Sequence, residues 1–146
     1  MKSYPHILIL GSNFAGLTTA RYIREYAGED VRMSCIDRKP YLTFIPNIPI
    51  EVWNNNNPER DLHLPFVKFL DRDNIDFIQA DVQHIDVEKK TVEYMPTERP
   101  GSAAESISYD YLVIALGNRL TFDEIEGFAE YGHTFTDTYY GDKVRR

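Results

Sequence analysis

A short glycine-containing turn between an apolar strand and a helix is the feature that most constrains this fold. The turn is Gly11-Ser12-Asn13-Phe14-Ala15-Gly16, and the apolar run Ile7-Leu8-Ile9-Leu10 precedes it. Apolar residues at helical spacing follow the turn and predict a helix that ends near Gly28: Leu17, Ala20, Ile23 and Ala27. A strand, a glycine turn and a helix in this order predict the start of a parallel βαβ unit.

A second strand and an acidic residue complete the pattern. The strand is predicted over Val31 to Ile36, and Asp37 follows it, twenty-one residues after Gly16. In a dinucleotide-binding unit the turn brings backbone N–H groups to a pyrophosphate, and the helix N-terminus adds partial positive charge. The acid accepts hydrogen bonds from a ribose diol. We therefore predict that the turn holds the phosphates of a dinucleotide and that Asp37 holds its ribose.

The residue at the centre of the turn departs from the usual pattern. Asn13 stands where the G-x-G-x-x-G motif has its second glycine, which normally lets the backbone approach the phosphates closely. Asparagine tolerates left-handed backbone angles better than most residues, and its amide can donate a hydrogen bond to a phosphate oxygen. An ordinary strand-to-helix turn, with two glycines by coincidence, stays open as the alternative.

Composition excludes several classes of protein. A chain of 146 residues with 42% hydrophobic residues is about one folded domain. Its 23 acidic and 16 basic residues give a net charge of −7, which argues against a nucleic-acid surface. The four histidines are too scattered to predict a metal site. The single cysteine, Cys35, lies in the second predicted strand, where we expect a buried side chain and no disulfide.

The hydrophobic pattern also limits where the chain acts. The N-terminal apolar run of four residues is too short for a signal peptide. No stretch approaches the roughly 20 apolar residues of a membrane-spanning helix. We therefore expect a soluble or peripheral chain.

The middle of the chain carries fewer signals of regular structure. Arg38 to Pro65 holds five prolines and the asparagine run Asn54 to Asn57, so we interpret it as a long, mostly irregular segment. Such long loops are usually functional or mobile. A short helix is predicted over Phe66 to Leu70, and a third parallel strand over Ile75 to Gln79.

The pattern then changes to short strands. Three runs are separated by turn-forming or polar residues: Val82 to Asp86, Thr91 to Met95, and Ser106 to Tyr109. They predict an antiparallel meander over residues 81–110. The apolar run from Tyr109 to Gly117 predicts a strand buried on both faces, and few helix or strand signals follow Asn118. The predicted class is α/β, a Rossmann-like parallel sheet with a three-stranded antiparallel β-meander.

This order of elements resembles the first half of the FAD domain in flavoproteins with two dinucleotide-binding domains. The resemblance lies in the N-terminal unit, the meander and the strand Tyr109-Asp110-Tyr111-Leu112-Val113-Ile114-Ala115-Leu116-Gly117, and it extends from His6 to about Arg145. This FAD-dependent pyridine nucleotide-disulfide oxidoreductase superfamily includes disulfide reductases, type II NADH dehydrogenases and sulfide:quinone oxidoreductases. It implies that residues 1–146 are the N-terminal part of an FAD-binding domain that is incomplete and inactive alone.

Two segments are similar to the sulfide:quinone branch. Tyr41-Leu42-Thr43-Phe44-Ile45-Pro46-Asn47-Ile48-Pro49 is similar to its Tyr-Phe-x-Phe-x-Pro-Ser-x-Pro stretch, and so is the run from Gly117 to Phe122 that leads to Gly127. The disulfide reductases carry cysteines that this chain lacks between Asp37 and Leu64. Type II NADH dehydrogenases have a Phe-x-Pro-Leu-Leu-Tyr stretch that fits less well, and they stay open as the alternative. So does a stiff surface loop without a cofactor role.

The resemblance assigns contacts to the adenosine half of FAD. Gly11, Ser12, Asn13, Phe14, Ala15 and Gly16 would hold the pyrophosphate. Asp37 would hold the ribose, and Arg38 would lie beside the ribose or the adenine. Val82 would present its backbone to the adenine. For Arg38 a solvated turn without a role in binding is an equally open interpretation.

The flavin half would be held by residues further along the chain. Residues 38–65 would form a long active-site loop, in which Ile45 and Pro46 line the flavin ring. Gly117 would let the last strand pass close to the cofactor. A cysteine that many members carry corresponds to Thr136 here, which puts sulfur handling at that place in doubt. No catalytic residue is assigned.

The resemblance also implies an activity and partners. Family members pass two electrons from a donor through FAD to a quinone, and the donor is a small sulfur compound or NADH. A cytoplasmic location, or attachment to the cytoplasmic membrane through C-terminal helices not found in this sequence, would follow. We expect weak FAD retention and homo-oligomers from the isolated chain. A non-catalytic nucleotide-binding module is the third open hypothesis.

Overall fold

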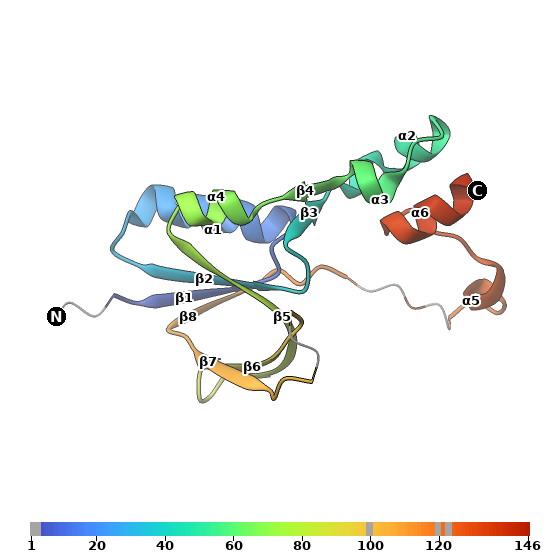
Figure 1. Ribbon diagram of the computed structural model, residues 1–146. Coiled ribbons are helices and arrows are strands. Elements are labelled where there is room, and N and C mark those ends of the chain that lie inside the picture. The colour runs from blue at the N-terminus through green and yellow to red at the C-terminus, as the bar shows by residue number, and fades with distance from the viewer. Residues whose placement is uncertain (1–3, 99–100, 119–120, 122–123) are drawn as a thin grey trace. The chain divides into compact units, whose positions relative to one another are not determined.

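The computed structural model describes residues 4–98, 101–118, 121 and 124–146 (Figure 1). The chain forms two compact units. The first unit contains residues 1–41 and 65–117, and the second contains residues 42–64 and 118–146.

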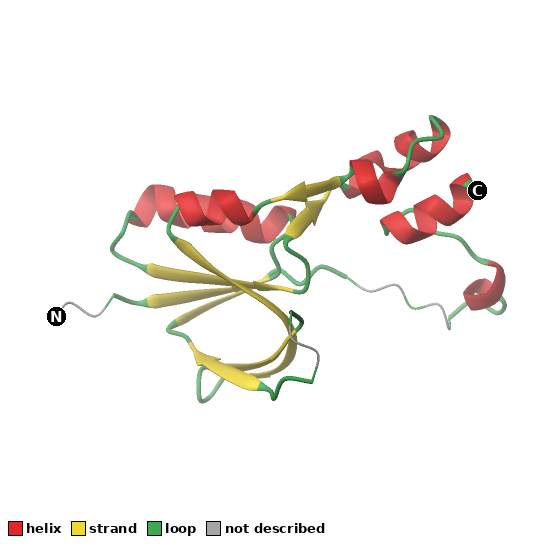
Figure 2. Cartoon of the chain, viewed as in Figure 1, coloured by secondary structure: helices red, strands yellow, loops and turns green. Residues whose placement is uncertain are grey.

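The first unit is built on a sheet with the strand order β7-β6-β5-β2-β1-β8, counted over the described residues. Its strands are β1 (His6–Leu10), β2 (Arg32–Asp37), β5 (Ile75–Asp86), β6 (Thr91–Pro96), β7 (Glu105–Ser108) and β8 (Tyr111–Ile114). Strands β5, β2, β1 and β8 are parallel, whereas β5, β6 and β7 form an antiparallel meander. Helices α1 (Phe14–Ala27) and α4 (Val67–Arg72) cover one face of the parallel strands, and the meander curls beneath the other (Figure 2). The predicted fold class is confirmed.

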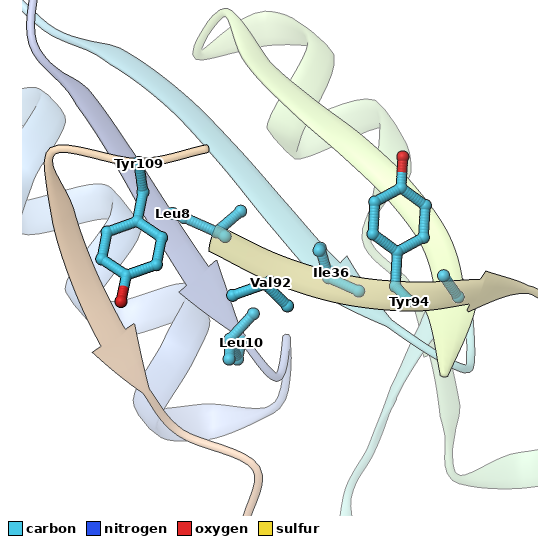
Figure 3. Close-up of a cluster of buried hydrophobic side chains, with 7 residues drawn as sticks. Leu8, Leu10, Ile36, Val92, Tyr94 and Tyr109 are labelled. Atoms are coloured by element: carbon cyan, nitrogen blue, oxygen red, sulfur yellow. The ribbon is translucent and has the colours of Figure 1, made fainter. Parts of the chain in front are cut away.

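The core of the first unit lies between the parallel strands and the meander (Figure 3). Its buried members are Leu8, Leu10, Ile36, Ala80, Val92, Tyr94 and Tyr109. Alternate residues of a strand point to opposite faces, so Ile9 and Cys35 belong to the face beneath the helices. Both faces of β1 and β2 are therefore buried, which holds the carboxyl ends of these strands at a defined edge of the sheet.

Helix α1 begins and ends as the sequence predicts. Asn13 is its N-cap, and Gly28 follows its last residue with a φ of +56°. The Arg24 side chain donates hydrogen bonds to the carbonyl groups of Asp73, at 2.8 Å, and Asn74, at 2.9 Å. It also donates to the Gly28 carbonyl. These bonds fasten the end of α1 to the turn that leads into β5.

Strand β8 differs from its prediction. The apolar run was expected to be buried on both faces, but Tyr111 and Ile114 are 63% and 62% exposed. Among the described strands β8 pairs with β1 alone, so it lies at the edge of the sheet. An apolar run is typical of a central parallel strand, and the pattern carries no information on whether a neighbour is present on both sides.

The predicted irregular segment between Arg38 and Pro65 is more ordered than expected. It contains β3 (Tyr41–Thr43), the 3-10 helix η1 (Ile45–Asn47), α2 (Ile48–Trp53), α3 (Pro58–Asp61) and β4 (His63–Pro65), and β3 pairs with β4. The prolines of this segment predict an irregular chain. Pro46, Pro49 and Pro58 instead occupy the first positions of short helices, where a missing N–H costs nothing and a fixed φ is favourable.

The second unit is completed by α5 (Phe128–Tyr131) and α6 (Thr138–Arg145). Neither helix was predicted from the sequence, because helices this short are not stable by themselves and leave no clear helical pattern in the sequence. Packing holds α6 in place: a Cβ at Gly141 would lie 2.6 Å from the Ile48 side chain. The buried Asp142 carboxylate accepts hydrogen bonds from Arg145 and Arg146, the shorter ones at 2.7 Å.

In the part of the chain that the structure describes, no helix combines the length and the apolar character that crossing a bilayer requires. No group of three or more histidine, cysteine and acidic side chains there is arranged to hold a metal ion.

A buried histidine joins three strands of the first unit at the amino-terminal edge of the parallel sheet. The His6 backbone N–H donates to Asp110, at 2.7 Å. The ring atom Nδ1 lies 2.7 Å from the Ser108 carbonyl oxygen, and Nε2 lies 2.9 Å from the Ser34 hydroxyl. The Arg32 guanidinium also lies 2.9 Å from Nδ1 and can only donate, whereas the Ser108 carbonyl can only accept, so these two neighbours favour opposite tautomers of the neutral ring.

We expect His6 to make the stability of the protein depend on pH. Burial lowers the pKa of His6, and nearby Arg32 acts in the same direction, whereas the Ser108 carbonyl, Asp110 and Asp76 oppose them. The unfolded chain takes up a proton near the ordinary value of about 6.5, and the folded protein does so only at lower pH. This contribution to stability is therefore complete above about pH 6.5 and is lost as pH falls through the folded-state pKa.

The measurement is urea unfolding of the wild type and His6→Gln between pH 8 and pH 5. The wild type should lose stability toward acid more steeply than the variant, which has no ring to titrate. Parallel pH profiles for the two proteins would contradict the role given to His6.

Candidate dinucleotide-binding site

The glycine turn is packed tightly against the neighbouring backbone of the first unit. Gly11 has a φ of +94°, and its N–H donates to the Ile36 carbonyl at 2.8 Å. A Cβ at Gly11 would lie 2.3 Å from the Ala115 carbonyl oxygen. The position therefore requires glycine for two reasons, the left-handed backbone and the close approach of the chain that follows β8.

The second glycine lies where α1 meets the turn. A Cβ at Gly16 would lie 1.7 Å from the Gly11 carbonyl oxygen, so no side chain fits there. Close packing of the helix against the first strand is the role of the third glycine in the dinucleotide motif. The N–H groups of the first helical turn lack partners within the helix, and with the helix dipole they form a site that favours an anion.

Asn13 acts differently from the sequence-based interpretation. Its φ is −94°, so the tolerance of asparagine for left-handed angles is not used. The side-chain oxygen accepts a hydrogen bond from the Phe14 N–H at 3.1 Å, and this caps α1. The next two side chains, of Phe14 and Ala15, are exposed.

Asp37 faces the turn from the end of β2. One carboxylate oxygen accepts a hydrogen bond from the Ser12 N–H at 2.6 Å, and the other accepts from the Lys39 N–H at 3.0 Å. The spacing between the turn and the acid therefore does bring the two together, as a ribose-binding carboxylate requires. The contacts of Asp37 and the turn with a nucleotide stay predictions.

The residues predicted near the adenine lie at the same edge of the first unit. The Arg38 guanidinium is 3.8 Å from the Asp81 carboxylate, and these side chains are 72% and 49% exposed. Val82 follows Asp81 in β5, at an irregularity in the pairing with β6. The ion pair thus links the end of β2 with the residue before Val82. An exposed pair of this kind adds little to stability, so its place at this edge is the more informative property.

The residues predicted around the flavin ring are spread over both units. Ile45 and Pro46 lie in η1 of the second unit, half-buried and exposed respectively. Gly117 ends the first unit with a φ of +78°. Their assignment to the flavin stays a prediction. The run from Gly117 to Phe122 includes residues 119, 120 and 122, which lie outside the described residues.

One contributor to the site, and one property of the predicted residue Ser12, were not foreseen from the sequence. The Ala115 carbonyl limits the turn from one side, and this depends on the register of β8 against β1, which no local signal reveals. The second is the Ser12 side chain, which is 1% exposed. Within the described ranges, Ser12 Oγ is the buried side-chain oxygen or nitrogen that has no hydrogen-bond partner.

These features fit an adenine dinucleotide. Glycine backbone without room for a side chain lies at the turn, the N-terminus of α1 follows it directly, and a carboxylate lies at the end of β2 within hydrogen-bond distance of the turn. The first two suit a pyrophosphate, and the third suits a pair of ribose hydroxyl groups.

Comparison with known proteins agrees with this geometry. Residues 5–144 match the family described as pyridine nucleotide-disulphide oxidoreductase. The chain is 32% identical over 117 residues to a sulfide-quinone reductase of Aquifex aeolicus (strain VF5), a match that covers 80% of this chain and 25% of that protein. It is 29% identical over 141 residues to the demethylphylloquinone reductase NdbB of Synechocystis, covering 92% of this chain and 34% of the relative.

A solved structure is also similar to this chain. The crystal structure of the sulfide:quinone oxidoreductase from Aquifex aeolicus matches with a TM-score of 0.83 and 28% identity, over 97% of this chain and 30% of the other. The chain thus spans between a quarter and about a third of the length of the relatives it matches.

Proposed function

Because the chain belongs to the pyridine nucleotide-disulphide oxidoreductase family, we propose that it is the FAD-binding portion of a flavoprotein oxidoreductase. The observation that carries this proposal is the hydrogen bond from the Ser12 N–H to Asp37, which brings the ribose-type acid against the glycine turn. Bound FAD supplies two-electron transfer, a chemistry that amino-acid side chains lack. The chain itself would bind and orient the cofactor.

Each part of the site has a role in this proposal. The turn from Gly11 to Gly16 and the start of α1 would hold the pyrophosphate. Asp37 would accept hydrogen bonds from the ribose, with Arg38 and the Val82 backbone near the adenine. Ile45, Pro46 and Gly117 would lie around the flavin ring.

We propose sulfide:quinone oxidoreduction as the activity to which this portion contributes. The similarity to the sulfide-quinone reductase of Aquifex aeolicus in sequence and in structure supports this choice. The partners would be a small sulfur donor and a quinone. A membrane-peripheral location would bring the protein to its quinone. Cys35 is fully buried, and burial raises the pKa of its thiol to about 12, so it is not a candidate to attack sulfide.

A second candidate activity is quinone reduction with NADH as the donor. The match to demethylphylloquinone reductase NdbB covers more of this chain, 92% against 80%, although at lower identity. Thr136 also favours this candidate, because it stands where many family members carry a cysteine and its hydroxyl has no thiol chemistry. The Thr136 hydroxyl shares a hydrogen bond with the Thr134 hydroxyl at 2.8 Å.

The first test of the proposal is titration of the 146-residue chain with FAD, in which binding is monitored by the quenching of flavin fluorescence. Saturable binding, with competition by ADP, is expected because the adenosine and pyrophosphate contacts lie on this chain. Riboflavin lacks both groups and is the matched control ligand. A chain that binds neither FAD nor ADP would overturn the proposal and favour an interaction module that uses the fold alone.

The donor is tested with the longest reading frame that contains this sequence. After FAD loading, bleaching of the flavin absorbance by sulfide and its return with a soluble quinone would support the first candidate. Bleaching by NADH, with no response to sulfide, would support the second.

We expect the isolated chain to hold FAD weakly and to self-associate. Apolar side chains are exposed along β8 and just after it, since Tyr111, Ile114 and Leu116 are 63%, 62% and 52% exposed. An uncharged, exposed edge strand is a template for pairing with another chain. Gel filtration with light scattering should therefore give a mass above that of a monomer and a flavin content well below one per chain. A monodisperse monomer that retains one FAD per chain would contradict this expectation.

A further inference from the structure

The outer face of α2, in the second unit, exposes a tryptophan. Trp53 is 90% exposed and Ile50 is 54% exposed, whereas Ile48 on the opposite side of the helix is fully buried. The buried side packs against α6 (Figure 1), where a Cβ at Gly141 would touch the Ile48 side chain. Residues three apart lie on the same side of a helix, so Ile50 and Trp53 form one exposed apolar surface.

The segment around this surface carries almost no charge. Residues 42–58 contain one charged side chain, Glu51, although 27% of the residues in the whole chain are charged. Both oxygens of the Glu51 carboxylate are occupied, since the Asn47 amide donates to one at 2.6 Å and the Asn56 amide donates to the other at 2.7 Å. Most of the net charge of −7 therefore lies elsewhere on the molecule.

The turn that follows α2 consists of uncharged amides. Its backbone is satisfied by the helix, because the N–H groups of Asn54, Asn55 and Asn56 donate to carbonyl groups of α2 at 3.0, 3.1 and 2.8 Å. The side chains of these three asparagines are exposed. An amide side chain both donates and accepts hydrogen bonds without carrying a charge. We refer to Ile50, Trp53 and the three asparagines as the α2 tip.

We propose that the α2 tip contacts the headgroup region of a lipid bilayer. The indole of Trp53 suits this region, because its ring is apolar and its N–H is polar, and tryptophan is enriched at membrane surfaces. The exposed amides suit the ester and phosphate oxygens that lie there. A charged side chain at this place would have to leave water at a high cost, and the α2 tip has none.

The choice of a bilayer over a protein partner rests on the proposed function. In that function the electron acceptor is a quinone, an apolar molecule that dissolves in membranes. Helix α2 follows directly after η1, which contains Ile45 and Pro46, the residues proposed to lie around the flavin ring. A membrane contact at the α2 tip would therefore bring the lipid phase toward this part of the site. It also places a contact on this chain itself, apart from the C-terminal helices that the resemblance implies.

The contact should be weak and nearly independent of salt. Even a myristoyl chain, which buries more apolar surface, binds membranes with an association constant of only about 10⁴ M⁻¹, and stable attachment needs a second signal. The α2 tip should therefore orient the protein on a membrane rather than hold it there alone. Contacts made by clusters of lysine and arginine weaken as salt rises, whereas an uncharged surface gives salt nothing to screen.

The test uses the single tryptophan of the chain as its reporter. Because Trp53 is that tryptophan, the tryptophan fluorescence of the 146-residue chain reports on the α2 tip alone. Phosphatidylcholine vesicles should shift the Trp53 emission to shorter wavelength, and brominated acyl chains in those vesicles should quench it. The affinity for vesicles should change by less than about twofold between about 0.05 and 0.5 M sodium chloride.

Sedimentation with the same vesicles compares the variants. Trp53→Ser should weaken binding about tenfold, and Ile50→Ser about threefold, because each removes apolar surface that the bilayer would bury. Tyr26→Ser is the matched control, since Tyr26 is an aromatic residue of α1 in the first unit and is 82% exposed. This control should bind like the wild type. Substitutions at exposed positions change stability little, and urea unfolding checks this for each variant.

Four outcomes would overturn the membrane contact. The Trp53 emission could stay unchanged with vesicles, or it could shift with protein concentration in their absence, which would assign the α2 tip to a second copy. Tyr26→Ser could weaken vesicle binding as much as Trp53→Ser. In the longest reading frame that contains this sequence, the wild type and Trp53→Ser could bind vesicles equally, which would mean that another part of the polypeptide covers the α2 tip.

The titration with FAD separates these outcomes from a failure of the proposed function. If the chain binds FAD but not vesicles, the proposed function stands without this membrane contact. If it binds vesicles but neither FAD nor ADP, the proposed function is overturned, and the membrane contact stands without its link to a quinone.

Discussion

Replacing Gly16 by alanine should abolish nucleotide binding and destabilise the first unit severely. A Cβ at this position would lie 1.7 Å from the Gly11 carbonyl oxygen. Relief of this clash requires α1 to move away from the turn, because the atom it meets is backbone. Forcing an added methyl group into tight packing costs about 1–3 kcal/mol, and more where nothing can yield. A domain of this size is stable by only about 5–15 kcal/mol, so a large share of its stability would be lost.

Two measurements test this prediction. Urea unfolding, monitored by circular dichroism, gives the stability of the variant, and titration with FAD gives the affinity of any protein that is still folded. Gly28→Ala is the matched control. Gly28 has a φ of +56° and a ψ of −137° but no atom within 4 Å of its Cβ position, so the change costs only the backbone strain of an alanine in this conformation, about 1–3 kcal/mol. Equal stability losses in the two variants would show that steric contact at the turn is not the reason for glycine at position 16.

The sequence predicted the first βαβ unit well because its signals are local. The end of α1 at Gly28 is visible in the sequence, whereas the capping role of Asn13 was not predicted. The distance along the chain from Gly16 to Asp37 is determined by one helix and one strand. In a parallel pair this brings the acid to the turn, and the Asp37 hydrogen bond to the Ser12 N–H is the result.

Properties that depend on distant parts of the chain were not predictable in this way. The exposure of β8 depends on whether another strand pairs with it, which its own apolar residues do not report. The helices α2 and α6 are held by packing around Gly141, between segments some 90 residues apart. The Ser12 side chain could point to solvent or into the sheet in any strand-to-helix turn. Its burial depends on how the turn packs against the rest of the first unit.

The Asp37 carboxylate, which contacts the glycine turn, has two hydrogen-bonding roles. It holds the turn by accepting from the Ser12 N–H, and in the proposed complex it also accepts from the ribose hydroxyl groups. A carboxylate has about four acceptor positions, so the bonds to Ser12 and Lys39 leave room for a diol. Asparagine has nearly the same shape but replaces one acceptor oxygen by a donor and removes the charge.

Asp37→Asn should therefore weaken FAD binding about 10- to 150-fold, which corresponds to the loss of one charge-assisted hydrogen bond of about 1.5–3 kcal/mol. ADP should lose affinity by the same factor, because its ribose is the one that Asp37 is proposed to hold. Asp81→Asn is the matched control: it removes a carboxylate at the same edge that meets the exposed Arg38 at 3.8 Å and accepts from the Gln83 side chain at 3.1 Å. The change in affinity should be less than about threefold, because such surface interactions are weak. A smaller effect at Asp37 than at Asp81 would mean that the ribose is bound elsewhere. The glycine turn would then bind phosphate without the acid that makes it a dinucleotide site.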